Sequence, residues 1–311
     1  MASVLSVREL RKVYPGKKPF VAVDGITFDL HQGEILGLLG ANGAGKTTTI
    51  QMLMSTLTPS SGQISYFGKD LARNRSEVLK HVAFASTYVS LPWNLTVEQN
   101  LDVFGRMFGL TWKERRKQRE ALLERFGILK KRKEYVSKLS AGQITRLMLV
   151  KAFMIKPKVV LLDEPTASLD PDIAKDVCEF VLDQRDSEGI SILFTSHNMA
   201  EVAEVCDRVL FLQQGKIIAD DLPQNLARSV AKSTVELVVG DGLKRAMSIA
   251  EQLQLPYSVD HRLIQLKLDE KQVAHLLSAF ADAKVTYSSI NITQPTLADY
   301  FLHMVSREDK P

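Results

Sequence analysis

The order of hydrophobic and polar positions in the first part of the chain predicts mainly β-strands. Apolar residues alternate with polar ones in two stretches, as expected of strands that bury only one face. A third stretch is almost wholly apolar, which is typical of a strand buried on both faces of a sheet. A glycine-rich turn leads from it into a helix, and a Pro-Ser-Ser-Gly turn precedes one more strand. The predicted strands span 4–10, 22–30, 35–39 and 63–67, and the predicted helix spans about 45–56.

Helical patterns dominate the middle of the chain, from about residue 89 to 157. Basic residues gather there in the runs 113–119 and 130–133. We interpret these runs as solvated helix faces, with contact to lipid headgroups or an acidic partner as the alternative. After this region an alternation of strands and helices returns, which favours an α/β core. Its predicted elements are strands over 159–162, 190–195 and 209–212 and a helix over 171–185.

Beyond residue 222 the pattern of hydrophobic and polar positions changes, which predicts a separate unit appended to the first. Strands and amphipathic helices are expected there in the order β-α-β-α-β, followed by a helix, which is consistent with a small α/β sandwich. The predicted strands span 235–239, 263–268 and 285–292, and the helices span 243–253, 271–281 and 297–305. We therefore expect two domains, 1–222 and 223–311.

The composition is that of an ordinary globular protein. Hydrophobic residues make up 45% and charged residues 24% of the 311 positions, which argues against disorder, and a net charge of +4 does not by itself indicate a nucleic-acid partner. The cysteines, Cys178 and Cys206, form no CxxC pair, so neither a disulfide framework nor a zinc site is expected. No secretory signal is visible, and no apolar run approaches the roughly 20 residues that cross a bilayer. Any work at a membrane would require docking to another chain.

A glycine-rich motif of the form GxxxxGK[ST] joins the apolar strand 35–39 to the helix that follows it. Glycines allow successive backbone N–H groups to point at phosphate oxygens, and a helix N-terminus adds partial positive charge. In such a motif Lys46 reaches the β- and γ-phosphates of a nucleotide, and Thr47 gives an oxygen ligand to Mg²⁺. The candidate nucleotide-binding residues are Gly40, Ala41, Asn42, Gly43, Ala44, Gly45, Lys46, Thr47 and Thr48.

Two acids, Asp163 and Glu164, end the apolar strand 159–162. Successive residues of a strand point to opposite sides, so Asp163 can serve a Mg²⁺ site while Glu164 addresses an attacking water. A bound cation would offset the electrostatic repulsion between two adjacent carboxylates. On their own they could equally be solvated acids at a strand end. Together with the glycine-rich motif, they predict a P-loop nucleotide hydrolase.

Further segments resemble the motifs of the ABC ATPases. The run Leu139-Ser140-Ala141-Gly142-Gln143 is similar to the family's LSGGQ signature, and the run 167–170, which ends at Asp170, looks like its D-loop. His197 follows a predicted strand, as the family's switch histidine does, and Tyr14 lies where the family has an aromatic side chain that stacks on adenine. The motifs occur in the family's order, and the resemblance extends to about residue 222.

The resemblance implies a fold and a reaction. The expected fold is a P-loop, RecA-like α/β core with an N-terminal antiparallel β subdomain and a helical subdomain at about 89–157, plus the small C-terminal α+β domain. The expected reaction is hydrolysis of ATP with Mg²⁺. Glu164 would act on the water, His197 would contact the γ-phosphate, and Asp163 and Thr47 would hold the metal. All of these remain expectations from the family pattern.

The resemblance also implies partners. Two subunits, identical copies in the simplest case, would enclose two ATP molecules head to tail, with Ser140 and Gly142 supplied by the opposing subunit and Asp170 coupling the sites. A separate transmembrane permease would bind the motor at the cytoplasmic face of the membrane. The segment 295–302 resembles the ending of ATPases that serve efflux of drugs, lipids or polysaccharides, which favours export. The alternatives are a soluble ABC-type ATPase and an ATP-dependent regulator that is not tied to transport.

Two positions depart from the family pattern. The first signature glycine is Ala141, which adds a methyl group and keeps the backbone N–H. The family's glutamine after the strand before the helical region, a further Mg²⁺ ligand, aligns with Thr87, beside Ser86. A hydroxyl can ligate Mg²⁺ but is shorter than a glutamine side chain. The sequence therefore predicts weaker coupling to Mg²⁺ at Thr87 and an otherwise active site.

Overall fold

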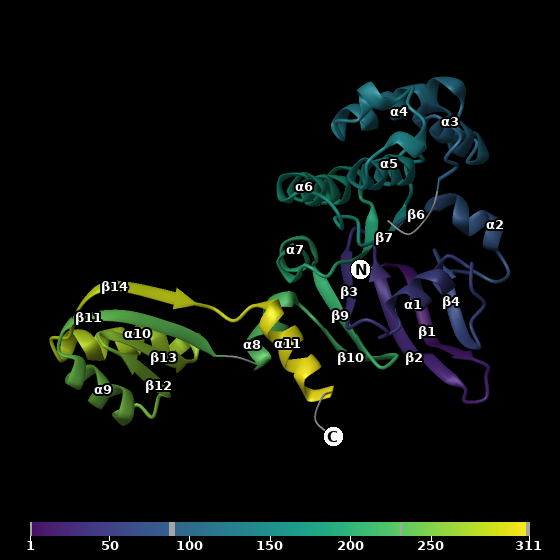
Figure 1. Ribbon diagram of the computed structural model, residues 1–311. Helices are drawn as coiled ribbons and strands as arrows, with labels where there is room; N and C mark the ends of the chain where they lie inside the picture. Colours follow the sequence, from purple (N-terminus) through teal and green to yellow (C-terminus); the bar gives the residue numbers. More distant parts are fainter. Residues whose placement is uncertain (1, 87–90, 231, 309–311) are drawn as a thin grey trace. The chain divides into compact units, whose positions relative to one another are not determined.

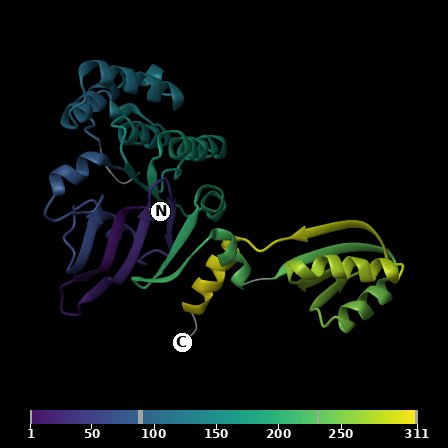
Figure 2. The ribbon, with the colours of Figure 1, turned by 180° about the vertical axis from the view of Figure 1, so that it is seen from behind.

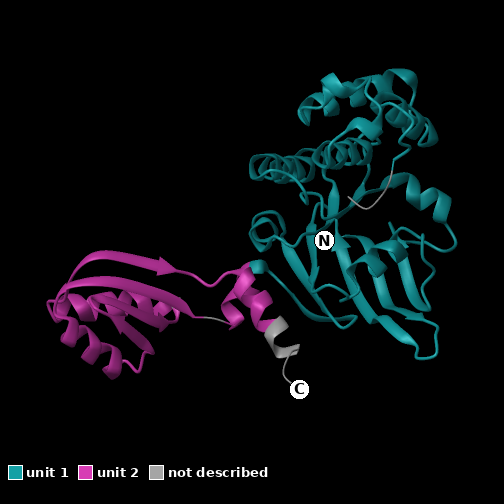
Figure 3. Cartoon of the chain, in the orientation of Figure 1, with its two compact units in different colours: residues 1–223 teal, residues 224–311 magenta. Residues whose placement is uncertain are grey.

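The computed structural model describes residues 2–86, 91–230 and 232–308. The chain divides into two compact units, Met1–Pro223 and Gln224–Pro311 (Figure 3). No sheet is shared between the units, and each unit has its own cluster of buried apolar side chains.

The first unit contains two sheets (Figure 1). An antiparallel sheet has the strand order β2-β1-β4-β5, and a six-stranded sheet has the order β10-β9-β3-β8-β7-β6. The antiparallel sheet is built from β1 Ser3–Tyr14, β2 Phe20–His31, β4 Ser61–Tyr66 and β5 Lys69–Asp70. The larger sheet is built from β3 Ile35–Gly40, β6 Val82–Ser86, β7 Val159–Asp163, β8 Ser191–Thr195, β9 Arg208–Gln213 and β10 Lys216–Asp221.

The larger sheet is parallel except for its edge strand β10. Its central strands are fully buried, because an all-parallel region is covered on both faces and carries few polar side chains. The register places Asp163 opposite Ser86 on one side and opposite Thr195 on the other. The carboxyl ends of β6, β7 and β8 therefore meet at one edge of the sheet, which is where open α/β sheets bind ligands.

Seven α-helices accompany these sheets in the described part of the first unit. The helices α3, α4 and α5 form a helical subdomain that stands apart from the antiparallel sheet (Figure 1). The helices are α1 Lys46–Leu53, α2 Arg75–Val78, α3 Val97–Met107, α4 Trp112–Arg125, α5 Ala141–Phe153, α6 Pro171–Glu188 and α7 Met199–Val205. Thr96, Thr111 and Ser140 cap α3, α4 and α5 through capping boxes, so local sequence fixes where each begins. In the described part of the chain, no helix is long and apolar enough to cross a membrane.

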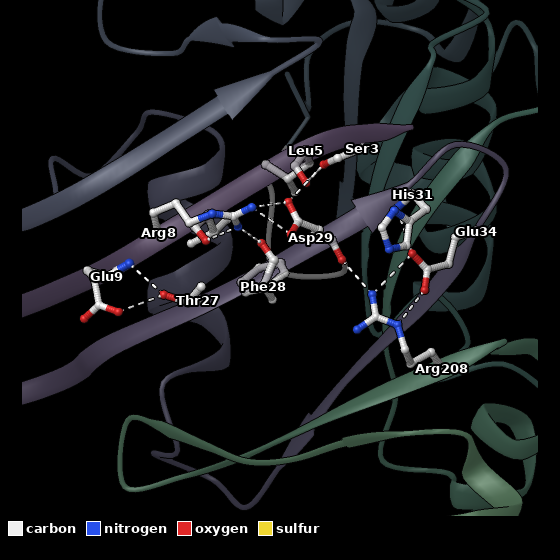
Figure 4. A network of polar contacts seen from close by, with 11 residues as sticks. Ser3, Leu5, Arg8, Glu9, Thr27, Phe28, Asp29, His31, Glu34 and Arg208 are labelled. Carbon is white, nitrogen blue, oxygen red and sulfur yellow. Dashed lines mark hydrogen bonds and ion pairs between the residues drawn. The ribbon is translucent and has the colours of Figure 1, made fainter. Parts of the chain in front are cut away.

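A polar network joins the antiparallel sheet to the larger sheet at Arg208 (Figure 4). The Arg208 guanidinium donates to Glu34 Oε1 at 2.8 Å, to Asp220 Oδ1 at 2.5 Å and to the backbone oxygen of Asp29 at 2.7 Å. The side chain of Glu34 is only 9% exposed. Arg8, by contrast, pairs with the Asp29 carboxylate on the exposed surface of the antiparallel sheet.

Replacing Arg208 with alanine is expected to lower the free energy of unfolding of the first unit by about 3 kcal/mol, because Glu34 would stay buried without its cation. The matched variant Arg8→Ala removes an exposed pair and should cost about 0.5 kcal/mol. Urea unfolding followed by tryptophan fluorescence reports the first unit, since both tryptophans, Trp93 and Trp112, lie in it. Equal costs for the two variants would contradict the role given to Arg208.

The second unit contains a four-stranded antiparallel sheet with the helices α9 and α10 on one face, seen from behind in Figure 2. Its strand order is β12-β13-β11-β14, and this order with β-α-β-β-α-β connectivity is the ferredoxin-like arrangement. The buried side chains alternate along β11, as expected of a sheet with one covered face. The elements are α8 Pro223–Val230, β11 Ser233–Asp241, α9 Leu243–Gln252, β12 Tyr257–Asp260, β13 Leu263–Leu268, α10 Glu270–Asp282, β14 Thr286–Thr293 and α11 Leu297–Glu308.

Most predicted elements are found within a few residues of their expected positions, and the mixed fold class is confirmed. The hydrophobic pattern did not predict the edge strands β5, β10 and β12. It also gave no bounds for the edge strand β6, which only the family alignment implied, as the strand before Thr87. The order expected for the second unit therefore lacked one strand. β12 has only four residues, three of them exposed, so it carries no run of buried positions that a hydrophobic pattern could show.

Candidate functional site

A cavity of about 260 Å³ opens at the edge where the parallel strands end. It brings together the glycine-rich loop after β3, the acids at the end of β7 and the residue that follows β8 by two positions. The lining side chains and backbone belong to Phe20, Ala22, Asn42, Gly43, Gly45, Lys46, Thr47, Thr48, Asp163, Glu164 and His197.

Glycine is required by close packing at two positions of the loop. Gly40 has φ +150°, and a Cβ there would lie 2.3 Å from the Leu212 backbone oxygen. Gly45 has φ +109°, and a Cβ there would lie 2.5 Å from the Ala22 backbone oxygen. The loop is therefore pressed against β9 and β2, and only residues without a side chain let it turn there.

Lys46 folds back over the loop that precedes it. Its ammonium donates to the backbone oxygens of Gly40 at 2.7 Å and Ala41 at 3.2 Å. Burial lowers the pKa of Lys46, while the nearby carboxylates of Glu164 and Asp163 act in the opposite direction. The cation is therefore held at the cavity by carbonyl oxygens that a phosphate could replace as its partners.

Thr47 and Thr48 follow Lys46 in the first turn of α1, and Thr47 is exposed to the cavity. The first N–H groups of a helix have no partner within the helix, so this turn can present both donors and a hydroxyl to a bound anion. Thr49 by contrast turns inward and donates to the Gly45 oxygen at 2.9 Å. The loop thus divides into residues that face the cavity and residues that fix its shape.

Asp163 is buried at the base of the cavity and is held by hydroxyl groups. Thr195 Oγ1 donates to Asp163 Oδ1 at 2.9 Å, and Ser86 Oγ donates to Asp163 Oδ2 at 3.5 Å. These donors come from the strands on either side of β7, as the register requires. The Lys46 ammonium lies near enough to act electrostatically on Asp163, and the hydroxyl donors leave the carboxylate negatively charged oxygens that suit a bound cation.

Glu164 has a left-handed backbone conformation, with φ +53°, which few residues other than glycine adopt. Its backbone N–H is held by the hydroxyl and the backbone oxygen of Thr195, at 3.0 and 3.2 Å. Its carboxylate lies 2.6 Å from His197 Nε2. The two side chains predicted to act on water and γ-phosphate are therefore in direct contact at the cavity, although 33 positions separate them in sequence.

Tyr14 and Phe20 lie opposite each other in the antiparallel pairing of β1 and β2. Cross-strand partners share one face of a sheet, so both rings lie on the same exposed side. Phe20 lines the cavity, whereas Tyr14 does not. Sequence reasoning named Tyr14 and missed Phe20, because only the hairpin register brings residue 20 beside residue 14.

The signature-like run 139–143 caps α5. Ser140 Oγ accepts from the Gln143 N–H at 3.3 Å, and the Gln143 side chain accepts from the Ser140 N–H at 3.0 Å. Ser140 and Ala141 are exposed, and in the described part of the chain the N–H groups of Ala141 and Gly142 have no protein acceptor. None of these five residues lines the cavity of its own chain, as far as the described residues go.

Asp170 caps α6 from an exposed position, and its side chain makes no capping hydrogen bond. The preceding turn packs closely on the signature run, since a Cβ at Gly142 would lie 3.3 Å from the Ser168 oxygen. The two segments are therefore coupled within one chain. Thr87 lies outside the described residues, so the prediction of weaker Mg²⁺ coupling stays a prediction.

Comparison with known proteins identifies the family. A profile described as "ABC transporter" matches residues 23–167. The linearmycin resistance ATP-binding protein LnrL of Bacillus subtilis (strain 168) is 31% identical over 311 residues, which cover 98% of this chain and 99% of that protein. This chain belongs to the ATP-binding proteins of ABC transporters. The ABC resemblance read from the motifs is thereby confirmed.

Other relatives of this ABC ATPase agree. The Nod factor export ATP-binding protein I of Paraburkholderia xenovorans (strain LB400) is 32% identical and covers 96% of each chain. A solved structure of an ATP-binding subunit of an ABC transporter has a TM-score of 0.68 and 28% identity, and it covers 73% of this chain and 93% of that one. The fold class and the ATPase function are therefore established, and subunits of this family work with transmembrane partners.

Proposed function

We propose that this ABC ATPase is the Mg-ATP-hydrolysing motor subunit of an exporter. The observation that carries the proposal is the contact of Glu164 with His197 beside Lys46 and the glycine-rich loop, in one cavity. Glu164 accepts a proton from the attacking water, and His197 steadies the γ-phosphate. Lys46 and the loop N–H groups hold the phosphates, so the chain's task is mainly positioning and electrostatic stabilisation.

The donor set suits Mg²⁺ as the metal of this reaction. Asp163 at the base of the cavity and Thr47 at its rim offer oxygen atoms, which a hard cation prefers, and the other ligands would be phosphate oxygens and water. Among the described residues there is no cluster of three His, Cys, Asp or Glu side chains that would make an all-protein cage. When bound, the metal neutralises charge on the phosphates. Thr87 is proposed as a further ligand.

Two subunits are proposed to enclose the nucleotides, most simply as a homodimer. In the signature run Leu139–Gln143, Ser140 and Ala141 are exposed and the N–H groups of Ala141 and Gly142 have no acceptor among the described residues. The run does not line the cavity of its own chain, which supports its use by the opposing site. Ser140 and Gly142 would contact the γ-phosphate there. Asp170 would couple the sites, and Tyr14 together with Phe20 would offer an apolar surface to the adenine.

The ABC domain is proposed to span 1–222 and the accessory domain 223–311. Relatives matched along nearly their whole length are named for linearmycin resistance and Nod factor export, which supports export as the direction. We infer a peripheral position at the cytoplasmic face of the membrane, held by a separate permease subunit that carries the substrate specificity. No nucleic-acid partner is expected.

A mild-detergent purification of the tagged full-length chain from its native membranes tests this proposal. A polytopic membrane protein in about equal amount to this chain is the expected result, and it should be missing from a mock purification without the tagged chain. Recovery only from the soluble fraction, with ribosomes, nucleic acid or no partner, would instead favour the soluble ATPase or the regulator.

A further inference from the structure

Glu201 joins the segment around His197 to the segment that follows Glu164. It lies in the first turn of α7, and its carboxylate accepts three hydrogen bonds from side chains. Glu201 Oε2 accepts from Thr166 Oγ1 at 2.7 Å and from Ser196 Oγ at 2.9 Å. Glu201 Oε1 accepts from Asn198 Nδ2 at 3.1 Å. One side chain therefore holds donors from two loops that are far apart in sequence.

The two hydroxyl donors are buried. Thr166 is 8% and Ser196 is 6% exposed, so water could not readily replace Glu201 as the hydrogen-bond acceptor of either hydroxyl. In the described part of the chain, no lysine, arginine or histidine forms an ion pair with Glu201. Hydrogen bonds to an ionised acceptor are stronger than neutral ones, and removing the acceptor would leave buried donors unsatisfied.

Each donor is tied closely to a group of the catalytic cavity. Ser196 directly precedes His197. Thr166 lies in a tight turn, in which the Ala167 N–H donates to the Glu164 oxygen and the Leu169 N–H donates to the Thr166 oxygen, each at 3.2 Å. Displacement of Thr166 would therefore shift Glu164 on one side and the start of α6 on the other.

We propose that Glu201 is a positioning residue for ATP hydrolysis, which holds His197 against Glu164 by fixing the backbone on both sides of that contact. The inference rests on the roles proposed above for Glu164 and His197. The His197 side chain is 49% exposed, so few packing contacts hold it in place. Its position therefore depends on where the backbone of residue 197 is held. The competing role is purely structural, an acid in the first turn of a short helix.

The kinetic constants of full-length variants distinguish the two roles. Glu201→Ala is expected to lower kcat for ATP hydrolysis about 10- to 100-fold, since a misplacement of about 1 Å can cost that much, with KM for ATP changed less than about 3-fold. Glu201→Gln keeps one acceptor oxygen and should recover part of kcat. The matched control Glu204→Ala changes an exposed acid of the same helix and should leave kcat unchanged.

Two further variants test the same link without touching Glu201. Thr166→Val and Ser196→Ala each remove one donor, and each combined with Glu201→Ala should lower kcat by less than the product of the single effects. Additive effects would mean that these side chains act independently of Glu201. If Glu201→Ala does not fold, the single variants Thr166→Val and Ser196→Ala still test the proposal. Full kcat in both single variants would overturn it.

The Glu164→Gln variant separates this inference from the proposed function. If Glu164→Gln loses turnover while folded Glu201→Ala keeps kcat within about twofold of the parent, Glu201 has only a structural role and the proposed function stands. If Glu164→Gln itself keeps full turnover, the catalytic assignment fails, and the positioning role assigned to Glu201 falls with it.

Discussion

Glu164→Gln is expected to lower kcat for ATP hydrolysis about 10²- to 10³-fold, while the affinity for ATP stays within a few-fold of the parent. The glutamine amide is nearly isosteric with the carboxylate but cannot accept the proton of the attacking water. The loop N–H groups and Lys46, which would bind the phosphates, are untouched. The loss should therefore fall on the chemical step.

Steady-state ATPase assays and equilibrium binding of a fluorescent ATP analogue would measure the two effects separately. Glu188→Gln is a suitable control, since its side chain is 51% exposed in α6, and it should keep full turnover. A second readout is the association state. Because hydrolysis would release the dimer, Glu164→Gln should accumulate as an ATP-bound dimer in size-exclusion chromatography. Unchanged turnover in Glu164→Gln would show that another group activates the water.

Gly45→Ala is expected to weaken ATP binding by at least about 100-fold and to cost about 2–4 kcal/mol of stability. Two effects act together at this position. The backbone has φ +109°, which L-residues rarely adopt, and the added Cβ would lie 2.5 Å from the Ala22 oxygen. The loop must move away from β2, and the N–H groups that would bind phosphate move with it.

Gly68→Ala is the matched control for backbone strain alone. Its φ is +76°, and no heavy atom lies within 4 Å of its added Cβ. It should cost about 1 kcal/mol, with unchanged ATP affinity. Thermal unfolding and titration with the fluorescent analogue would compare the variants. If Gly45→Ala binds ATP like the parent, the close contact with Ala22 does not shape the loop.

The sequence determined the local parts of this protein. The glycine-rich motif, the acids that end an apolar strand and the signature run are contiguous, so each was visible without any fold. The capping boxes at the start of α3, α4 and α5 each involve residues only three positions apart, so they too depend on local sequence. Together these motifs were enough to predict the ABC family and the fold class, which the comparisons confirm.

Only the tertiary structure decided which distant groups meet. The 2.6 Å contact between Glu164 and His197, the hydroxyls around Asp163 and the hydrogen bond from Thr166 to Glu201 depend on which parallel strands are neighbours and on their register. Phe20 reaches the cavity through a hairpin register, and β12 forms at a sheet edge with little burial. Hydrophobic periodicity records how each segment faces the core, but strand order and register are set by packing between segments, which no single segment encodes.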